Sequence, residues 1–413
     1  MALNFIEFVF FFYMFIGLYM LIFLTIVFFQ NRKNLFSYPE AKKLEGVSIV
    51  MPCYNEAERV GEAIESLLRL DYPKDKLEII IVDDQSKDNS VEVIQKYVDK
   101  YENVRLIINS RNSGGAAEPT NIGIKNSKYD YIAVADADSM PKKDALKKMI
   151  GFLQEDSKVG AVTCSVLVRN PRKFIQKLQA IEYASISFSR KLLDFVDAVY
   201  VTPGPFALYK KNVLLEVGLF DTKNLTQDIE IIWRLLKHGY KAKMCLDTSV
   251  HSYSPERFKS WFRQRVRWSI GGTQTLIKHR NELFKKRMLG FFVIPFFAIS
   301  TFLGLLGLSI FIYLIVKKFL IYYLVTKYSI YGGTALFYLQ DVNVSPSILN
   351  YFGVILFILG VFFTIFGLFV VKDKELGNNK FFNIAFYMII YLTIYPVILV
   401  FALYKLATGK YSW

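Results

Sequence analysis

The chain has 413 residues, a formal net charge of +15 and a hydrophobic fraction of 53%, which is high for a protein with 21% charged residues. This mixture argues against a purely soluble protein and predicts a globular domain joined to membrane segments. The three cysteines, Cys53, Cys164 and Cys245, are widely spaced and odd in number, so they fit a reducing compartment and offer no metal cluster.

An apolar stretch near the N-terminus, Phe8 to Phe29, carries no charge and predicts a membrane helix. At about 22 residues it is long enough to cross a hydrocarbon core of about 30 Å. A cleaved signal peptide is the alternative, but no basic residue precedes the stretch, it is too long, and it lacks a small-residue cleavage site. The positive-inside rule predicts a cytoplasmic domain next, because basic residues follow: Arg32, Lys33, Lys42 and Lys43.

Residues from about Gly46 to Arg280 have the composition of a globular domain, whose first half alternates strand and helix signals. The expected strands are Val47 to Met51, Leu77 to Val82, Val104 to Ile108 and one ending at Asp136, and the expected helices are Glu58 to Leu70, Ser90 to Tyr101 and Pro119 to Asn126. This alternation predicts a parallel sheet with crossover helices, in which ligands bind beyond the carboxyl ends of the strands.

Acidic residues follow three of these strands. The first strand runs into Pro52-Cys53-Tyr54-Asn55-Glu56, the second into Asp83-Asp84-Gln85-Ser86 and the fourth into Asp136-Ala137-Asp138. Two carboxylates at i and i+2 repel each other unless a proton or a cation lies between them, and a hard divalent ion chelated by a diphosphate is a natural occupant. No GxGxxG or GxxxxGK[ST] pattern follows a strand, so neither a Rossmann dinucleotide site nor a P-loop is predicted. The alternative makes Asp84 and Ser86 helix N-caps.

The second half of the domain adds two helical elements. Asp228 lies near the N-terminus of the periodic segment Ile229 to Lys237, either as a general base or as simple compensation of the helix dipole. Gln264, Arg267 and Trp268 share one face of a helix, where a guanidinium can hold a diphosphate and an indole can stack on a sugar. The alternative there is an amphipathic membrane-surface helix, because Arg and Lys crowd the region.

Together these motifs resemble the membrane-bound family 2 glycosyltransferases of GT-A fold that carry a QxxRW signature, among them cellulose, chitin and hyaluronan synthases and ceramide glucosyltransferase. The motifs are Pro52-Cys53-Tyr54-Asn55-Glu56, Val82-Asp83-Asp84-Gln85-Ser86, Asp136-Ala137-Asp138, Thr226-Gln227-Asp228 and Gln264-Arg265-Val266-Arg267-Trp268. The resemblance covers roughly Val47 to Trp268 and implies an α/β, Rossmann-like GT-A domain. It also implies an inverting transferase that uses a nucleotide-activated sugar, with a family preference for UDP, and Mg²⁺ or Mn²⁺.

The same resemblance implies a role for individual residues. The nucleotide would be contacted by Pro52, Tyr54, Glu56, Asp84 and Asp136. The metal would be held by Asp136 and Asp138. Asp228 would be the catalytic base, and the diphosphate and acceptor would be framed by Gln264, Arg267 and Trp268.

The chain departs from the family pattern in three places. Thr226-Gln227-Asp228 replaces the common Thr-Glu-Asp, and Gly114-Gly115-Ala116-Ala117 stands where many polymerising members carry Gly-Lys-Ala. Thr202-Pro203-Gly204-Pro205-Phe206 stands at the small-residue acceptor loop, with prolines that stiffen it. These departures weaken the case for a processive polymerase and leave the transfer chemistry intact. His251, after an expected strand from Lys243 to Val250, is a second metal ligand or, as isolated histidines more often are, structural.

After Arg287 the chain returns to the membrane. Leu289 to Val316, Leu349 to Val371 and Phe381 to Tyr404 are each long enough to span, and Pro295 can break the first. The segment from Lys317 to Ser345 is rich in tyrosine and predicts an interfacial connection or another crossing. Four spans place both termini outside, whereas Lys405, Lys410 and Trp413 suit a cytoplasmic tail at least as well, so the topology stays open.

The expected organisation is therefore a membrane helix (1–30), a linker (31–45), a GT-A domain (46–256), basic interface helices with QxxRW (257–287) and a C-terminal membrane region (288–413). The chain is expected in the cell membrane as a multi-pass protein with a cytoplasmic catalytic domain. Its expected partners are a nucleotide-sugar donor, a lipid or glycan acceptor, and membrane lipids. Nucleic acid is not expected, because the basic residues lie beside the spans, where anionic headgroups are the simpler partner.

Three functional classes remain. The first is a membrane glycosyltransferase acting on a lipid-linked acceptor such as a polyprenyl phosphate or a glycolipid. The second is a processive synthase that extrudes its polymer, for which four spans in one chain are few. The third is a non-catalytic membrane scaffold, against which the intact carboxylates and the QxxRW signature argue.

Overall fold

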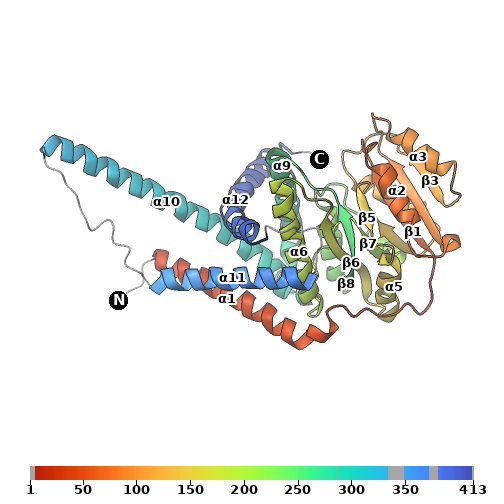
Figure 1. The fold of residues 1–413 in the computed structure, drawn as a ribbon, viewed down its shortest axis with the longest axis horizontal. Helices are drawn as coiled ribbons and strands as arrows, with labels where there is room; N and C mark the ends of the chain where they lie inside the picture. The colour runs from red at the N-terminus through yellow and green to blue at the C-terminus, as the bar shows by residue number, and fades with distance from the viewer. Residues whose placement is uncertain (1–4, 286, 334–347, 372–379, 412–413) are drawn as a thin grey trace.

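The protein consists of a globular α/β domain with long apolar helices at one end (Figure 1). The computed structural model describes residues 5–285, 287–333, 348–371 and 380–411. The expectations placed on Trp413 and on the connection between residues 334 and 347 lie outside the described residues.

Among the described residues, eight strands form one sheet in the order β3-β2-β1-β4-β7-β6-β8-β5. The strands are β1 Val47–Cys53, β2 Leu77–Asp83, β3 Val104–Ile108, β4 Tyr131–Val134, β5 Ser139–Pro141, β6 Val159–Val168, β7 Ala207–Lys210 and β8 Lys241–Ser252. β1 to β4 pair in parallel, as predicted. The rest of the sheet is mixed, because β7 runs antiparallel to β4 and β6 and β5 runs antiparallel to β8, whereas β6 and β8 pair in parallel.

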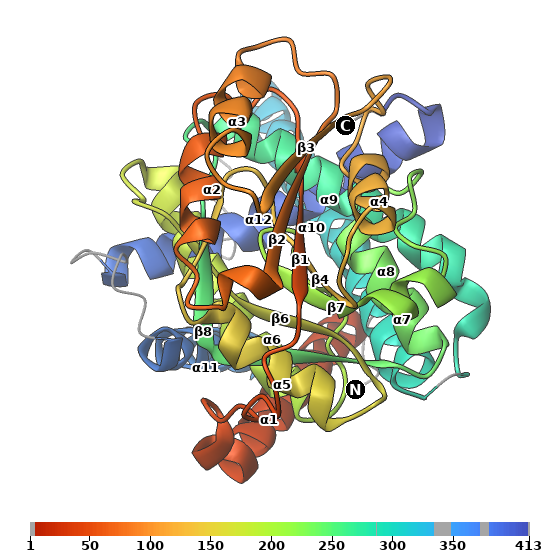
Figure 2. The ribbon, with the colours of Figure 1, turned by 90° about the vertical axis from the view of Figure 1, so that its right-hand side faces the viewer.

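Helices cover both faces of this sheet (Figure 2). The helices of the domain are α2 Val60–Leu68, α3 Ser90–Val98, α4 Ala117–Lys125, α5 Ala145–Glu155, α6 Phe174–Asp194, α7 Lys211–Glu216, α8 Gln227–Lys237 and α9 Phe258–His279. Ile49 and Met51 of β1 point into the core beneath α2, α3 and α5, whereas the intervening Val50 belongs to the core beneath α4, α7 and α8. This alternation follows from the two-residue period of a strand, and the strand ends are left free to form a site.

Four helices of the described residues are long and apolar enough to cross a membrane. They are α1 Phe5–Asn31, α10 Ile294–Gly332, α11 Ile348–Val371 and α12 Lys380–Thr408. Pro295 lies in the first turn of α10, directly after the π-helical segment Leu289–Val293, so the helix changes type next to the proline but is not interrupted there. The expected end at Val316 is wrong. The helix continues through Lys317 and Lys318 until Gly333, whose positive φ of 59° ends it.

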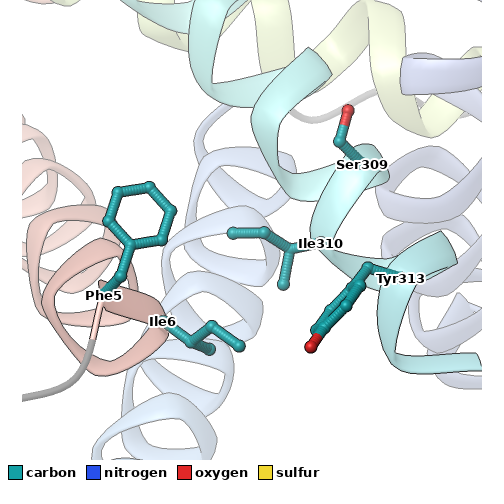
Figure 3. A pocket seen from close by; sticks show the side chains of 5 residues that line it. All are labelled: Phe5, Ile6, Ser309, Ile310 and Tyr313. Carbon is teal, nitrogen blue, oxygen red and sulfur yellow. The ribbon is translucent and has the colours of Figure 1, made fainter. Parts of the chain in front are cut away.

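Helix α6 is one of the places where the globular domain packs against the membrane helices. Phe188 of α6 packs against Phe28 of α1 and Phe366 of α11, with ring centroids 6.1 and 5.9 Å apart. Figure 1 shows α1 and α11 side by side, with α10 extending beyond both. A cavity of about 340 Å³ lies between the N-terminal end of α1 and the middle of α10 (Figure 3). It is lined by Phe5, Ile6, Ser309, Ile310 and Tyr313 and is remote from the strand ends.

Candidate active site

The ends of β1 and β2 are tied together and to the loop that follows β3. The Asp84 N–H donates to the Cys53 carbonyl at 2.8 Å, continuing the sheet past its last paired residues. The Asp84 carboxylate accepts hydrogen bonds from the Asn109 amide at 2.7 Å and the Ser113 hydroxyl at 2.8 Å. The alternative of Asp84 and Ser86 as N-caps is wrong, since α3 begins after Asn89 and both side chains bond to other loops.

The loop after β1 forms a rigid rim beside this carboxylate. The Asn55 N–H donates to Ser86 Oγ at 2.9 Å, and the Lys87 N–H returns a bond to Asn55 Oδ1 at 2.8 Å. Asn55 has a φ of 54°, a left-handed conformation that asparagine tolerates. Tyr54 is left 44% exposed, so its ring is free to stack on a flat ligand. Pro52 lies within β1, opposite Val82 of β2 and shortly before Tyr54.

Three carboxyl groups gather beyond β4. Burial, reinforced by the charge of Asp138, raises the pKa of Asp136 to about 7 and that of Glu56 to about 7. Burial also raises the pKa of Asp138, although its Oδ1 accepts hydrogen bonds from Ser252 at 3.2 Å and Ser139 at 3.3 Å. Carboxyl groups whose pKa is raised by burial and by one another's charge favour a proton or a cation among them.

A divalent ion fits these residues. Among the described residues no three His, Cys, Asp or Glu side chains form a complete metal cluster. Asp136 and Asp138 supply the carboxylate oxygens that Mg²⁺ and Mn²⁺ prefer, and Mg²⁺ is commonly held by one or two carboxylates plus substrate phosphates. His251 pairs with Met140 across β8 and β5, next to Ser252, and its role as a ligand stays a hypothesis.

The loop from Thr202 to Phe206 lies against this cluster. A Cβ built on Gly204 would be 3.0 Å from Asp136 Oδ2, so the backbone approaches the carboxylate closely. Thr202 Oγ1 lies 2.7 Å from the Tyr209 hydroxyl, which anchors the start of the loop to β7. The loop that the sequence analysis assigned to the acceptor therefore contacts the residue assigned to the nucleotide and metal.

Asp228 is the second residue of α8, and its Oδ1 accepts the Ile229 N–H at 3.1 Å. Burial raises its pKa, and the charge of Arg267 opposes that rise. Burial lowers the pKa of the Arg267 guanidinium, while Asp228 and Asp136 raise it. The charge of the arginine is therefore felt by both carboxylates, one on α8 and the other beyond β4.

Helix α9 holds the loop that precedes Asp228. Arg267 Nη1 donates to the Leu225 carbonyl at 3.2 Å, and the Leu225 N–H donates to Gln274 Oε1 at 3.0 Å. A Cβ on Gly271 would lie 2.3 Å from Thr226 Oγ1, so only glycine permits this approach of α9 to the start of α8. The predicted base and the predicted arginine are thus brought together by backbone contacts as well as by charge.

The remaining residues of the QxxRW helix contact α6. Gln264 Oε1 accepts a hydrogen bond from Gln179 Nε2 at 3.2 Å, and Trp268 stacks on Tyr183 with ring centroids 6.5 Å apart. Sequence reasoning missed Gln179 and Tyr183. Their i, i+4 spacing on one helix face was the available signal.

A mixed α/β sheet with carboxylates at its strand ends, an acidic residue at a helix N-terminus and a half-buried arginine on α9 fits a glycosyltransferase that uses a nucleotide-sugar donor. Its long apolar helices fit a membrane-bound form of this class.

The family model described as "Glycosyltransferase like family 2" matches residues 45–271, and the chain belongs to this family. It is similar to the poly-beta-1,6-N-acetyl-D-glucosamine synthase of Staphylococcus aureus, with 32% identity over 306 residues, 73% of this chain and 73% of that protein. The synthase of the same name from Staphylococcus epidermidis is 32% identical over 302 residues, 71% of this chain and 72% of that protein.

A solved structure shares the fold. It is the mannosyltransferase PcManGT from Pyrobaculum calidifontis in complex with GDP-Man and Mn²⁺, which is 18% identical with a TM-score of 0.55. The match covers 95% of this chain and 99% of that chain. The predicted family and the GT-A architecture are therefore confirmed.

Proposed function

We propose that the protein transfers a sugar, with inversion, from a UDP-sugar to a hydroxyl of a lipid-linked or membrane-proximal glycan acceptor. The observation that carries the proposal is that the charges of Asp228, Arg267 and Asp136 act on one another, while Arg267 bonds to the Leu225 carbonyl just before Asp228. A base, a cation and a carboxylate are thereby available close to one another.

The transfer is a single displacement at the anomeric carbon. Asp228 accepts the proton of the attacking hydroxyl, and its pKa, raised by burial, suits it to this task better than that of an exposed aspartate. Arg267 places positive charge where charge grows on the leaving diphosphate. One inverting displacement needs one base and no carboxylate nucleophile, in agreement with the single carboxylate on α8 that faces Arg267.

The donor is held by the strand ends. Tyr54 offers a stacking face to the base, while Pro52, Glu56 and Asp84 shape the nucleoside pocket. Asp136 and Asp138 hold Mg²⁺ or Mn²⁺, which when bound neutralises charge on the donor diphosphate. Trp268, with Gln264 beside it, offers the acceptor sugar the part of its half-buried ring that Tyr183 and Arg265 leave uncovered.

The same proposal assigns the membrane orientation and the domain limits. The four apolar helices anchor the chain, and the basic residues that follow α1 favour a cytoplasmic domain over residues 46–256. The basic segment 257–287, which contains α9, then lies at the lipid headgroups on the same side.

A processive polysaccharide synthase is the second candidate. It is favoured by the relatives, whose names describe a polymer product. Pro203 and Pro205 in the loop against Asp136 and the absent lysine near Gly115 favour a short product instead.

The test uses the full chain in lipid nanodiscs with a panel of labelled donors: UDP-N-acetylglucosamine, UDP-glucose and GDP-mannose. Released nucleotide and product size are measured with membrane lipid and with N-acetylglucosamine oligosaccharides as acceptors, and folded Asp228→Asn protein serves as the control. A short, UDP-dependent product supports the first candidate, and a long polymer supports the second. No turnover with any donor contradicts both and favours a scaffold.

A further inference from the structure

A buried ion pair connects the two helices that form the acceptor surface. Arg265 of α9 bonds through Nη2 to Glu182 of α6, and their side chains are only 1% and 4% exposed. Burying such a pair contributes little net stability, because the desolvation of both charges offsets their attraction. The pair instead fixes the positions of the Arg265 and Glu182 side chains, because each buried charge must stay next to the other.

The fixed Arg265 side chain in turn positions the Trp268 ring. The Arg265 guanidinium carbon lies 4.2 Å from the centroid of the Trp268 ring, within the range of a cation–π interaction. Tyr183, the neighbour of Glu182 on α6, stacks on the same indole. The Trp268 ring is thus contacted by Arg265, which is a member of the ion pair, and by Tyr183, which follows Glu182 in α6. Its orientation depends on Arg265 staying where the bond to Glu182 places it.

The C-terminal helix α12 completes this arrangement. The Tyr395 hydroxyl donates to Glu182 Oε1 at 3.3 Å, while Arg265 takes the other carboxylate oxygen. α12 is fixed against α9 by Phe401, whose ring lies 5.6 Å from that of Phe262, and by the fully buried Ile398. A helix that is apolar enough to enter the membrane therefore contacts the Trp268 support directly.

We propose that Glu182, Arg265 and Tyr395 are positioning residues that hold Trp268 in the orientation that binds the acceptor sugar, so that α12 sets acceptor affinity. This inference rests on the proposed function, in which Trp268 binds the acceptor. It predicts a defect in acceptor binding, because the three residues act on Trp268, whereas the donor is assigned to the residues at the strand ends.

Two variants test the proposal in nanodiscs, with UDP-N-acetylglucosamine as donor and an N-acetylglucosamine tetrasaccharide as acceptor. Arg265→Lys keeps a charge for Glu182 but loses the planar face beneath Trp268, and the acceptor KM should rise about tenfold. Tyr395→Phe removes only the hydroxyl that Glu182 accepts, and the acceptor KM should rise about threefold. The donor KM should change less than twofold in both.

The matched control is Asp194→Asn, which breaks a second buried ion pair on α6, between Lys191 and Asp194 at 2.8 Å. It should lower the melting temperature as Arg265→Lys does and leave the acceptor KM unchanged. An acceptor KM that is unchanged in both test variants, or raised equally in the control, overturns the positioning role while wild-type turnover stands. Absence of UDP release from the wild type contradicts the proposed function itself.

Discussion

Two groups of carboxylates in this domain differ in what surrounds them. Beyond the strand ends, Glu56, Asp136 and Asp138 are half-buried and repel one another, and the pKa of Glu56 and of Asp136 is raised to about 7. At the junction of α8 and α9, burial alone would raise the pKa of Glu230, but hydrogen bonds from His279 and Arg234 outweigh it and lower the pKa to about 2.

The partners of Glu230 explain this difference. Arg234 Nε lies 3.0 Å from both carboxylate oxygens, Lys278 Nζ lies 2.6 Å from Oε1, and His279 Nε2 lies 3.3 Å from it. The Glu230 cluster is neutralised by the protein itself and joins two helices. Cations are also present near Glu56, Asp136 and Asp138, since Arg59 lies 3.9 Å from Glu56 and lowers the pKa of Asp138, and Arg267 lowers that of Asp136, but burial and mutual repulsion outweigh them. A carboxylate whose pKa stays raised despite nearby cations is a candidate for a functional site, and one whose pKa is strongly lowered by direct hydrogen bonds is a structural one.

The largest effect should follow loss of a strand-end carboxylate. Asp138→Asn removes charge from the group that would hold the metal ion, so transfer should fall by a factor of about 10³ or more while the protein stays folded. Chelation should abolish wild-type transfer, and Mg²⁺ or Mn²⁺ should restore it. The checks are turnover with and without chelator and a thermal melt. Full activity in excess chelator would remove the metal from the mechanism.

Asp228→Asn should come next. The amide keeps the size of the side chain but cannot take the acceptor proton, so transfer should fall by a factor of about 10², with donor binding nearly unchanged. If Asp228 only compensates the helix dipole, the cost is instead about 1 kcal/mol of stability with activity retained. Single-turnover rates and donor titrations on folded protein separate the two, and a near wild-type rate sinks the assignment as base.

Glu230→Gln tests the other side of the comparison. Loss of one partner from the buried cluster should lower the free energy of unfolding by about 2 kcal/mol, with transfer per folded molecule retained. Because the pKa of Glu230 is lowered on folding, its stabilisation is present above the unfolded value of about 4.3 and is lost as pH falls toward 2. Denaturation of wild type and variant from pH 7 down to pH 3 should show the difference narrowing. A constant difference contradicts the ionised role.

Arg267→Ala should have the smallest of the four effects. If the guanidinium stabilises the leaving diphosphate, the turnover number should fall about tenfold, more than donor affinity does, because that charge matters most in the transition state. The control is Arg263→Ala, at an exposed position of the same helix. Unchanged turnover accompanied by release from lipid would make α9 a membrane anchor only.

Local sequence patterns predicted the elements that carry the strand-end residues. Val104–Ile108 has the expected bounds, and the charges of Asp138 and Asp228 both raise the pKa of Asp136, whereas the roles predicted for these residues stay predictions. In the mixed half of the sheet only β8, Lys241–Ser252, was predicted, as the strand Lys243 to Val250. β6, Val159–Val168, is buried along its whole length, so it lacks the alternation that reveals a half-buried strand.

Long-range contacts account for what the sequence did not reveal at the site. The pairing of Glu182 with Arg265 joins positions 83 residues apart, and that of Tyr395 with Glu182 joins positions 213 apart. No local period encodes such partners. The full extent of α10 was missed for a different reason, because Lys317 and Lys318 are a membrane-boundary signal and do not stop a helix.

The close approach of Gly271 to Thr226 divides two adjacent glycines into a constrained and a free position. A Cβ at Gly271 would meet the Thr226 backbone nitrogen at 2.6 Å, whereas one at Gly272 would meet nothing within 4 Å. In a library randomised at both codons and selected for sugar transfer, surviving sequences should converge on glycine at 271 and stay diverse at 272. The requirement for glycine at position 271, and not at 272, therefore reports how closely α9 must approach the start of α8 for the base and the arginine to lie near each other.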